Sequence, residues 1–199
     1  MKITTYKVEI KFLEPILGTV PKDQSIYDTY IKIRAKGKET KDEFASPLTH
    51  EETTLKEARG WTGFHEEKKK PYLFDYQIKG FLKDTANILK NSEDMTAAKS
   101  KVENYVFLSP RKIFIKGKRL KNPIERPLRA MTMQGPRVTL VRSDAMAENS
   151  KIEFELKILD GPISLTYLKK ILDFGKLRGL GQARNMGYGR FEYKLNESQ

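Results

Sequence analysis

The sequence predicts an α+β fold that is built around an antiparallel β-sheet. Two segments, 6–12 and 151–158, alternate between apolar and charged residues, which is typical of strands with one buried face and one face in solvent. Two other segments, 76–90 and 165–174, repeat their apolar residues at helical spacing. With further strands between and after them, these segments give the order β-α-β-β-α-β, which is ferredoxin-like.

The strands of this fold are expected in four places. The first covers residues 2–13, the second 103–116, the third 137–159 with an interruption, and the last 187–195. The four-stranded sheet of the ferredoxin-like fold is a common platform for RNA, although a fold alone does not fix a function.

The helices are delimited by their capping residues. The first is expected over 76–90. The second is expected over 165–174, because Ser164 is a suitable N-cap and Gly175 a suitable stop. A shorter helix is expected from 25 to 30.

The 199 residues are expected to form a single domain, 1–199. The core is interrupted by insertions at about 18–75 and 117–136. Within the first insertion, the stretch 36–70 is polar and mixed in charge, which favours a loop.

The net charge of +12 is concentrated in the second half of the chain. Residues 18–75 carry eleven basic and eleven acidic side chains, whereas 109–142 carry ten basic side chains and one acidic side chain, Glu125. Localised positive charge favours a polyanionic partner, such as nucleic acid or a nucleotide. The alternative is a generally basic protein with no such partner.

The cysteine content and the hydrophobic runs exclude several classes of protein. No cysteine is present, so disulfides, thiolate catalysis and cysteine-based zinc sites are excluded. No run approaches the roughly 18 apolar residues of a membrane span, and the N-terminus lacks the apolar stretch of a signal peptide. We therefore expect a cytoplasmic protein that works without a membrane, a metal or a cofactor.

The most distinctive motif is a glycine-rich stretch near the C-terminus. Gly179 and Gly181 are followed, after five residues, by Gly187 and Gly189, so two Gly-hydrophobic-Gly steps lie a fixed distance apart. Such glycines permit a bent loop whose N–H groups converge on an anion. No acidic residue occurs from 176 to 190, which indicates phosphate binding. The alternative is a purely structural turn from a helix into a strand.

The glycine motif and two further segments resemble the RAMP superfamily of CRISPR-associated proteins. There the same glycine pattern lies between the last helix and the last strand of a ferredoxin-like fold, as 179–189 does here. The stretch 75–83, with Lys79 before Gly80, resembles the start of the first helix in backbone-type RAMP subunits, and 151–159 resembles the strand before the second helix. The resemblance covers roughly half of the chain. It implies an RNA or nucleotide ligand and a place in a complex or a homo-oligomer.

The sequence departs from this superfamily where its nucleases act. The first strand leads into 14–18, Glu-Pro-Ile-Leu-Gly, rather than the aspartate-containing, glycine-rich loop with which one class of these subunits cleaves RNA. We therefore do not carry over that activity. The whole chain also resembles an uncharacterised family from phages of Gram-positive bacteria, in 126–129, 132–138 and 180–182. That resemblance implies a setting, the cytoplasm of an infected host cell, rather than an activity.

The candidate phosphate-binding residues combine the glycine loop with basic side chains elsewhere. An arginine fork can pair two phosphate oxygens at once, and a tyrosine can stack a base. The predicted nucleic-acid or phosphate-binding residues are Lys79, Arg126, Arg129, Arg137, Arg178, Gly179, Gly181, Arg184, Gly187, Tyr188, Gly189 and Arg190. Each has an ordinary alternative, since basic residues also solvate surfaces and a tyrosine at the start of a strand also packs in a core.

Catalysis has weaker support in the sequence. His65 and His50 each precede two glutamates that could orient a general base, but each also fits a solvated loop histidine, and no catalytic residue is assigned. Three classes of function remain. We favour a non-catalytic binder of RNA or single-stranded nucleic acid. The others are a phage anti-defence sponge for a small (cyclic) nucleotide signal and a metal-independent endoribonuclease.

Overall fold

The computed structural model describes residues 3–22, 60–90, 96–133, 135–159 and 161–197. Its elements in chain order are β1 (Ile3–Phe12), β2 (Ile16–Leu17), β3 (Val20–Pro21), β4 (Trp61–Gly63), β5 (His65–Glu67), β6 (Lys70–Phe74), α3 (Asp75–Leu89), α4 (Ala98–Tyr105), β7 (Val106–Ser109), β8 (Lys112–Phe114), β9 (Ile124–Thr132), β10 (Gly135–Ser143), β11 (Ala145–Met146), β12 (Lys151–Leu159), α5 (Leu165–Arg178), the 3₁₀ turn η1 (Arg184–Met186) and β13 (Phe191–Glu197). None of the described helices is long and apolar enough to cross a membrane.

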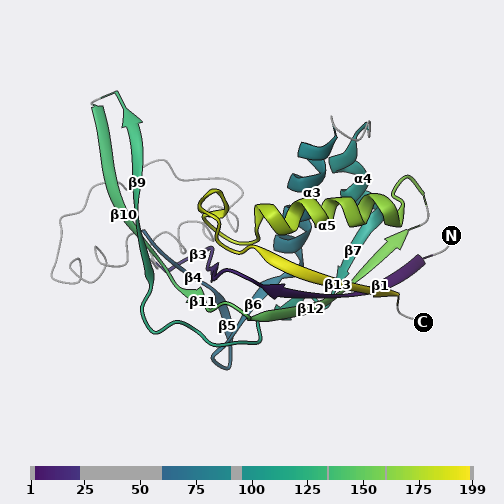
Figure 1. Cartoon of the computed structure of the whole chain (residues 1–199), viewed down its shortest axis with the longest axis horizontal. Helices are drawn as coiled ribbons and strands as arrows, with labels where there is room; N and C mark the ends of the chain where they lie inside the picture. Colours follow the sequence, from purple (N-terminus) through teal and green to yellow (C-terminus); the bar gives the residue numbers. More distant parts are fainter. Residues whose placement is uncertain (1–2, 23–59, 91–95, 134, 160, 198–199) are drawn as a thin grey trace, which may run out of the picture.

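The central sheet has four antiparallel strands in the order β13-β1-β12-β7. The element order β1-α3-β7-β12-α5-β13 is the ferredoxin-like one, so the predicted fold class is confirmed. Both α3 and α5 lie on one face of this sheet (Figure 1). The hydrophobic core lies between them, where Val8 and Ile10 of β1 join a buried cluster with Leu82 of α3 and Leu168 of α5.

The alternation in the sequence decides which face of the central sheet is buried. In β12, every second residue from Ile152 to Ile158 is buried, and the residues between them reach solvent. β1 has the same pattern, with Val8, Ile10 and Phe12 fully buried. Because side chains alternate between the two faces of a strand, these apolar residues all point toward the helices.

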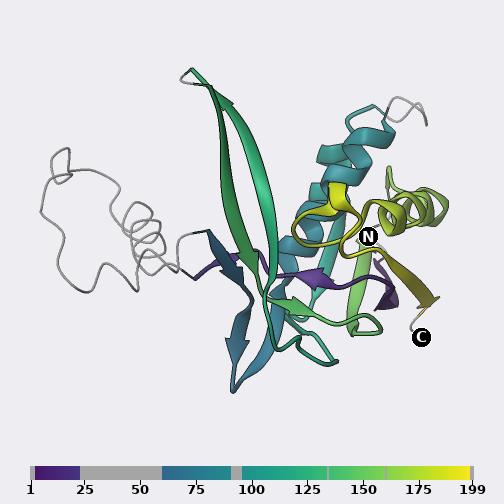
Figure 2. The ribbon, with the colours of Figure 1, turned by 60° about the vertical axis from the view of Figure 1, so that its left-hand side comes forward.

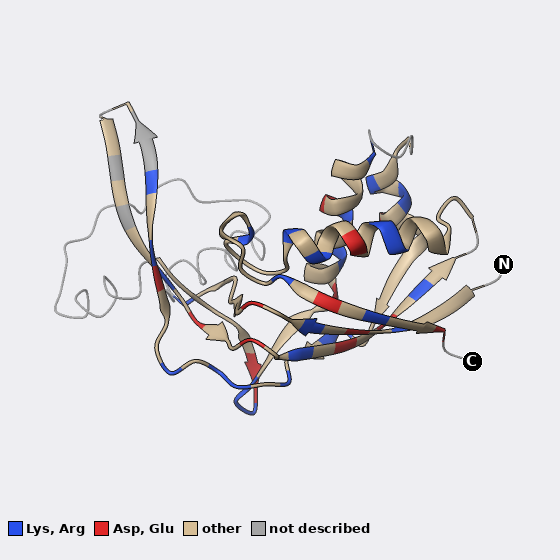
Figure 3. Cartoon of the chain, in the orientation of Figure 1, with Lys and Arg blue, Asp and Glu red and all other residues tan. Residues whose placement is uncertain are grey.

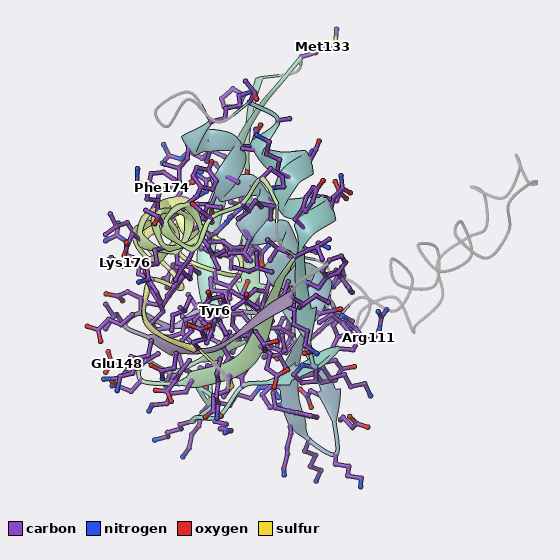
Figure 4. All side chains as sticks on the ribbon, turned by 90° about the vertical axis from the view of Figure 1, so that its right-hand side faces the viewer. Tyr6, Arg111, Met133, Glu148, Phe174 and Lys176 are labelled. Carbon is purple, nitrogen blue, oxygen red and sulfur yellow. The ribbon has the colours of Figure 1, made fainter. Side chains whose placement is uncertain are left out.

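A second sheet, β3-β4-β10-β9, carries a long antiparallel hairpin formed by β9 and β10. The hairpin projects away from the central sheet (Figure 2). Met133, at its turn, is fully exposed and extends beyond the end of the ribbon (Figure 4). A third sheet has the order β5-β6-β8, and β11 pairs with β2 in a two-stranded one.

A buried carboxylate ties the second sheet to the segment after β8. Asp144, directly after β10, accepts hydrogen bonds from Trp61 Nε1 (2.8 Å) and Lys22 Nζ (2.7 Å), and it pairs with Arg119. Arg119 also contacts Glu66, at 2.5 Å. Burial alone would raise the pKa of Asp144, but the hydrogen bonds from Lys22, Trp61 and Arg119 outweigh it and lower the pKa below its usual value.

Several predicted boundaries are wrong because strands occupy the expected loops. The basic insertion 117–136 contains β9, and the described end of the polar stretch 36–70 contains β4 and β5. Residues 135–143 pair with β9 in the second sheet, so the third core strand is β12 alone. The strand expected over 103–116 begins inside α4 and is then divided between two sheets, β7 in the central one and β8 in the third.

The two predicted core helices match α3 and α5 at three of their four ends. α3 agrees within one residue at both ends, and Ser164 caps α5 by accepting a hydrogen bond from the Tyr167 N–H. Gly175 is not a stop, because α5 continues to Arg178. A Cβ at Gly175 would lie 2.5 Å from Phe81 Cζ, so glycine allows α5 to pack closely on α3. The helix expected from 25 to 30 lies outside the described residues.

Candidate nucleic-acid interface

The glycine loop, residues 179–190, connects α5 to β13 as predicted. Its two Gly-hydrophobic-Gly steps lie against each other, because the Leu180 N–H donates to the Gly189 carbonyl at 2.9 Å. The contact requires glycine. A Cβ at Gly189, where φ is +71°, would lie 1.9 Å from the Leu180 carbonyl oxygen. A Cβ at Gly179 would lie 2.4 Å from the Tyr188 carbonyl oxygen. These glycines therefore have a structural role in the turn from α5 into β13.

The N–H groups of the loop are largely used within the protein. Gly189 N–H donates to the Pro15 carbonyl (3.0 Å) and Gln182 N–H to the Leu17 carbonyl (3.4 Å), which fastens the loop to the residues around β2. Gly187 N–H donates to the Arg184 carbonyl inside the loop. These three N–H groups are therefore not available to an anion, whereas the arginine side chains of the loop remain partly or fully exposed.

Two arginines of this region share one carboxylate on α3. Asp84 Oδ2 lies 3.1 Å from both Arg178 Nε and Arg184 Nη1. All three side chains are partly exposed. Two guanidinium groups on one carboxylate leave a net positive charge, and the shared partner holds both forks beside the loop. The sequence analysis missed Asp84, although it lies on the same helix face as Gln77 and Gly80.

Arg190 and Tyr188 complete the charged side of the loop. Arg190 is exposed, and its guanidinium lies over Gly187, where a Cβ would be 3.7 Å from Arg190 Cζ. Among the described residues, no carboxylate lies within ion-pair distance of Arg190. Tyr188 is partly buried and interacts electrostatically with the buried Arg126.

A pocket of about 270 Å³ opens between the loop and the start of α3. Its polar lining is Thr19, Gln77 and Arg184, and the rest is apolar or glycine. Gln77 is held in place because its amide donates to Thr19 Oγ1 (3.0 Å) and accepts from the Phe74 N–H (2.8 Å). The pocket reaches Gly80, where an added Cβ would meet no atom within 4 Å. The predicted Lys79-Gly80 motif therefore contributes its glycine to the site.

The two helical glycines, Gly80 and Gly175, should respond in opposite ways to alanine. Gly80→Ala should raise the free energy of unfolding by about 0.5–1 kcal/mol, because alanine is the better helix former and the new methyl has room. Gly175→Ala should lower it by about 1–3 kcal/mol, because the methyl would overlap Phe81. Urea denaturation followed by circular dichroism measures both. A loss at Gly80 as large as that at Gly175 would contradict the described helix packing.

The root of the hairpin is joined to the glycine loop by buried polar groups. Gln182 Oε1 accepts from Thr62 Oγ1 at 2.7 Å, and Ser143 Oγ lies 2.8 Å from that hydroxyl. Arg126, only 4% exposed, donates from Nη2 to Ser143 Oγ at 2.9 Å, while its Nε has no hydrogen-bond partner among the described residues. Burial lowers the pKa of Arg126, and the Tyr188 phenol partly offsets this. The predicted site residue Arg126 is therefore an internal cation at the hairpin root.

The other predicted basic residues lie apart from the loop. Arg129 is exposed on β9, opposite Val138 on β10. Arg137 lies on β10 opposite Ala130, and its side chain is outside the described set. Lys79 is on a different face of α3 from the pocket, since its Nζ lies 4.8 Å from the Phe107 ring centroid; burial lowers its pKa.

The candidate general base His65 has aromatic rather than acidic neighbours. Its ring stacks on Tyr72 (centroids 5.6 Å apart) and meets Phe74 edge-on (4.8 Å). Glu66 and Glu67, which were expected to orient it, instead pair with Arg119 and Lys112. Burial lowers the pKa of His65, so it is neutral near pH 7. His50 lies outside the described residues.

The open face of the central sheet mixes both signs of charge (Figure 3). Its charged residues are Lys7, Glu9, Lys11, Lys151, Glu153, Glu155, Lys157, Glu192 and Lys194. Because acidic side chains are interleaved with the lysines, this face does not offer the continuous basic platform that the fold alone suggested. On the helix side, the glycine loop carries the exposed Arg190, while Arg178 and Arg184 beside it share Asp84.

No family model and no curated protein matches this sequence. In fold, the chain resembles one in a cryo-EM structure of the Type III-B Cmr-beta bound to cognate target RNA, with 16% sequence identity and a TM-score of 0.50. The alignment covers 98% of this chain and 61% of that one, so the present chain spans about three fifths of its length.

A second similar fold occurs in a Type IV-B CRISPR complex. That chain has 10% sequence identity and a TM-score of 0.47, and the alignment covers 96% of the present chain and 90% of the other. At such identities the likeness concerns the fold, and the assignment of a ligand depends on the side chains described above.

Proposed function

We propose that this chain binds RNA or single-stranded nucleic acid, without cleaving it, through the glycine loop and the adjoining pocket. The observation that carries the proposal is the gathering of Arg178, Arg184 and Arg190 at one loop, where Arg178 and Arg184 share Asp84. The cluster retains positive charge, and the arginine fork matches the geometry of a phosphate.

The fold and the hairpin support RNA as the ligand. The similar fold in the Type III-B Cmr-beta structure belongs to an assembly that is bound to cognate target RNA. On the present chain, Arg129 adds an exposed cation on the hairpin, apart from the loop. Membership of a larger complex would fit the projecting hairpin, whose turn carries the exposed Met133.

The pocket beside the loop supports a second candidate ligand. Its volume of about 270 Å³ is near the lower limit for small-molecule sites, and Gln77 and Arg184 supply an amide and a cation. A small (cyclic) nucleotide could place a phosphate on Arg184. A phage anti-defence sponge would work in this way, and the phage setting is part of that hypothesis only. An endoribonuclease is not favoured, because His65 is surrounded by rings and its adjacent glutamates are engaged elsewhere.

Replacing Arg184 and Arg190 should weaken binding and reduce its dependence on salt. In Arg184→Gln/Arg190→Gln, the affinity for a labelled single-stranded RNA should fall about tenfold or more at moderate salt, as expected for loss of two charge-assisted contacts. The slope of log affinity against log salt should decrease by about 1.4, since each neutralised phosphate contributes about 0.7 for single strands. Fluorescence anisotropy across a salt series measures both.

The matched control removes the same charge from the opposite face of the sheet. Lys157→Gln/Lys194→Gln should leave the slope almost unchanged, because these lysines lie beside glutamates on the open face. If the two double variants weakened binding equally, RNA binding would depend only on the net charge of the protein, and the proposed site would be wrong. If the unmodified protein binds a cyclic dinucleotide tightly and the RNA not at all, the second candidate replaces the first.

A further inference from the structure

The face of the third sheet, β5-β6-β8, that points away from the core is aromatic, and the ring at its centre, Tyr72, is only 8% exposed. His65 pairs with Tyr72, and Tyr72 pairs with Phe114, so these three side chains share one face. Phe74, two residues after Tyr72, lies on the same face. The opposite face carries Leu73 and Ile113, which are buried in the core. The core therefore accounts for one side of this sheet only.

The rings of this surface form one connected group that extends onto α3. Successive ring centroids are 5.8 Å apart for Phe114 and Tyr72, 5.2 Å for Tyr72 and Phe74, and 5.2 Å for Phe74 and Tyr76. Tyr76 is nearly parallel to Phe74, with 19° between the rings. It is also 54% exposed, and Phe114 is 37% exposed. We call this group, together with His65, the aromatic face.

Cations lie directly on the aromatic face. The Arg111 guanidinium is 5.7 Å from the Phe74 ring centroid, and Lys112 Nζ is 5.4 Å from that of Tyr72. Lys112 also pairs with Glu67 at the far edge. Arg111 is exposed at the margin of the molecule (Figure 4). The turn between β5 and β6 adds the exposed Lys68 and Lys69, and the exposed Lys70 begins β6. Aromatic rings that alternate with cations suit a chain of bases and phosphates better than an apolar protein partner.

The aromatic face adjoins the proposed binding pocket. Tyr76 and Gln77 are consecutive residues of α3, and Gln77 lines the pocket while Tyr76 stacks on Phe74. A strand whose phosphates lie at Arg184 can therefore continue across the start of α3 and reach the rings. Each base has an apolar face that stacks on an aromatic side chain irrespective of sequence.

We propose that the aromatic face stacks unpaired bases of the bound single strand, with Tyr76 as the outermost ring and Arg111 as the cation that meets the adjacent phosphate. This inference rests on the proposed function and adds to it the part of the ligand that is recognised. The loop arginines contact the sugar-phosphate chain, and the aromatic face distinguishes a strand with accessible bases from one without them.

The test compares two ligands on each variant. The probes are a labelled oligouridylate and an abasic oligomer of the same length, whose sugar-phosphate chain is the same. The unmodified protein should prefer the oligouridylate. In Tyr76→Ala this preference should fall about tenfold, as expected when one stacking ring is removed, while affinity for the abasic oligomer and its salt slope stay within about twofold. Tyr76→Phe should keep the preference, because it keeps the ring.

Phe107→Ala is the matched control. Phe107 is 48% exposed and has Lys79 over its ring at 4.8 Å, but it lies on β7, outside the aromatic face. Its removal should leave the preference unchanged. An unchanged preference in Tyr76→Ala, an equal loss on both oligomers, or an equal effect of Phe107→Ala would each overturn the inference while the loop proposal stands. If neither oligomer binds the unmodified protein, the proposed function fails and this inference fails with it.

Discussion

Gly189→Ala should lower the free energy of unfolding by about 3 kcal/mol or more and abolish nucleic-acid binding. A left-handed backbone conformation costs a residue with a Cβ about 1–2 kcal/mol, and overpacking adds about 1–3 kcal/mol. Here φ is +71° and the new methyl would lie 1.9 Å from the Leu180 carbonyl oxygen, which is main chain and cannot rotate away. The two glycine steps would separate and carry Arg184 and Arg190 out of place. Urea denaturation and RNA anisotropy test the two consequences.

Gly187→Ala measures the energetic cost of the left-handed backbone conformation without the cost of a clash with main-chain atoms. Its φ is +88°, but the nearest atom to an added Cβ is Cζ of Arg190, at 3.7 Å. Only the conformational cost of about 1–2 kcal/mol is expected, with binding retained in part. If both alanine variants were equally stable, the close contact between Leu180 and Gly189 would not hold the loop together.

Asp144→Asn should lower the free energy of unfolding by about 3 kcal/mol at neutral pH. Asp144 is 6% exposed and holds Lys22 and Arg119, and removing one partner of a buried charge pair leaves the others uncompensated. Trp61 is the single tryptophan of the chain, and its indole N–H donates to this carboxylate. Tryptophan fluorescence therefore follows the site, and circular dichroism follows the whole fold.

The pH dependence of this effect has a definite sign. The folded-state pKa of Asp144 lies below its usual value, so its stabilising contribution is complete above the unfolded pKa of about 3.9 and is lost as the pH falls through the folded pKa. The difference between the unmodified protein and Asp144→Asn should shrink below about pH 4. Glu67→Gln is the control, because the Glu67–Lys112 pair is exposed and should contribute about 0–1 kcal/mol. A pH-independent difference would exclude the carboxylate charge as the cause.

The sequence was sufficient to predict the elements that have one buried and one exposed face. β1, β12, α3 and α5 each bury a regular set of apolar residues, so their periodicity is visible without the fold. β9 was missed because much of it lies in a hairpin arm with exposed residues, such as Leu128, and no core imposes a pattern on it. α4 was missed because it buries only Ala98 and Val102.

The basic residues of the candidate site could be predicted from the sequence, but their partners could not. Arg178, Arg184 and Arg190 were identified because the loop that carries them is contiguous in sequence. Asp84 is some hundred residues away from Arg184, and it joins the site only because α3 packs beside α5. Arg126 was expected at the surface, but it is buried. The residues that cover it are brought there by tertiary structure and are not visible in the local sequence. The aromatic face could not be predicted either, because it depends on which strands pair and in which register.

The hydrogen bonds from Gly189 to Pro15 and from Gln182 to Leu17 join the last quarter of the chain to its beginning. β1 likewise finds both of its neighbours, β12 and β13, only in residues from 151 onward. The loop can therefore close only after the ribosome has released all residues from Pro15 to Gly189. We therefore expect any binding through this loop to begin only once that whole stretch has been synthesised and folded, rather than gradually as it emerges.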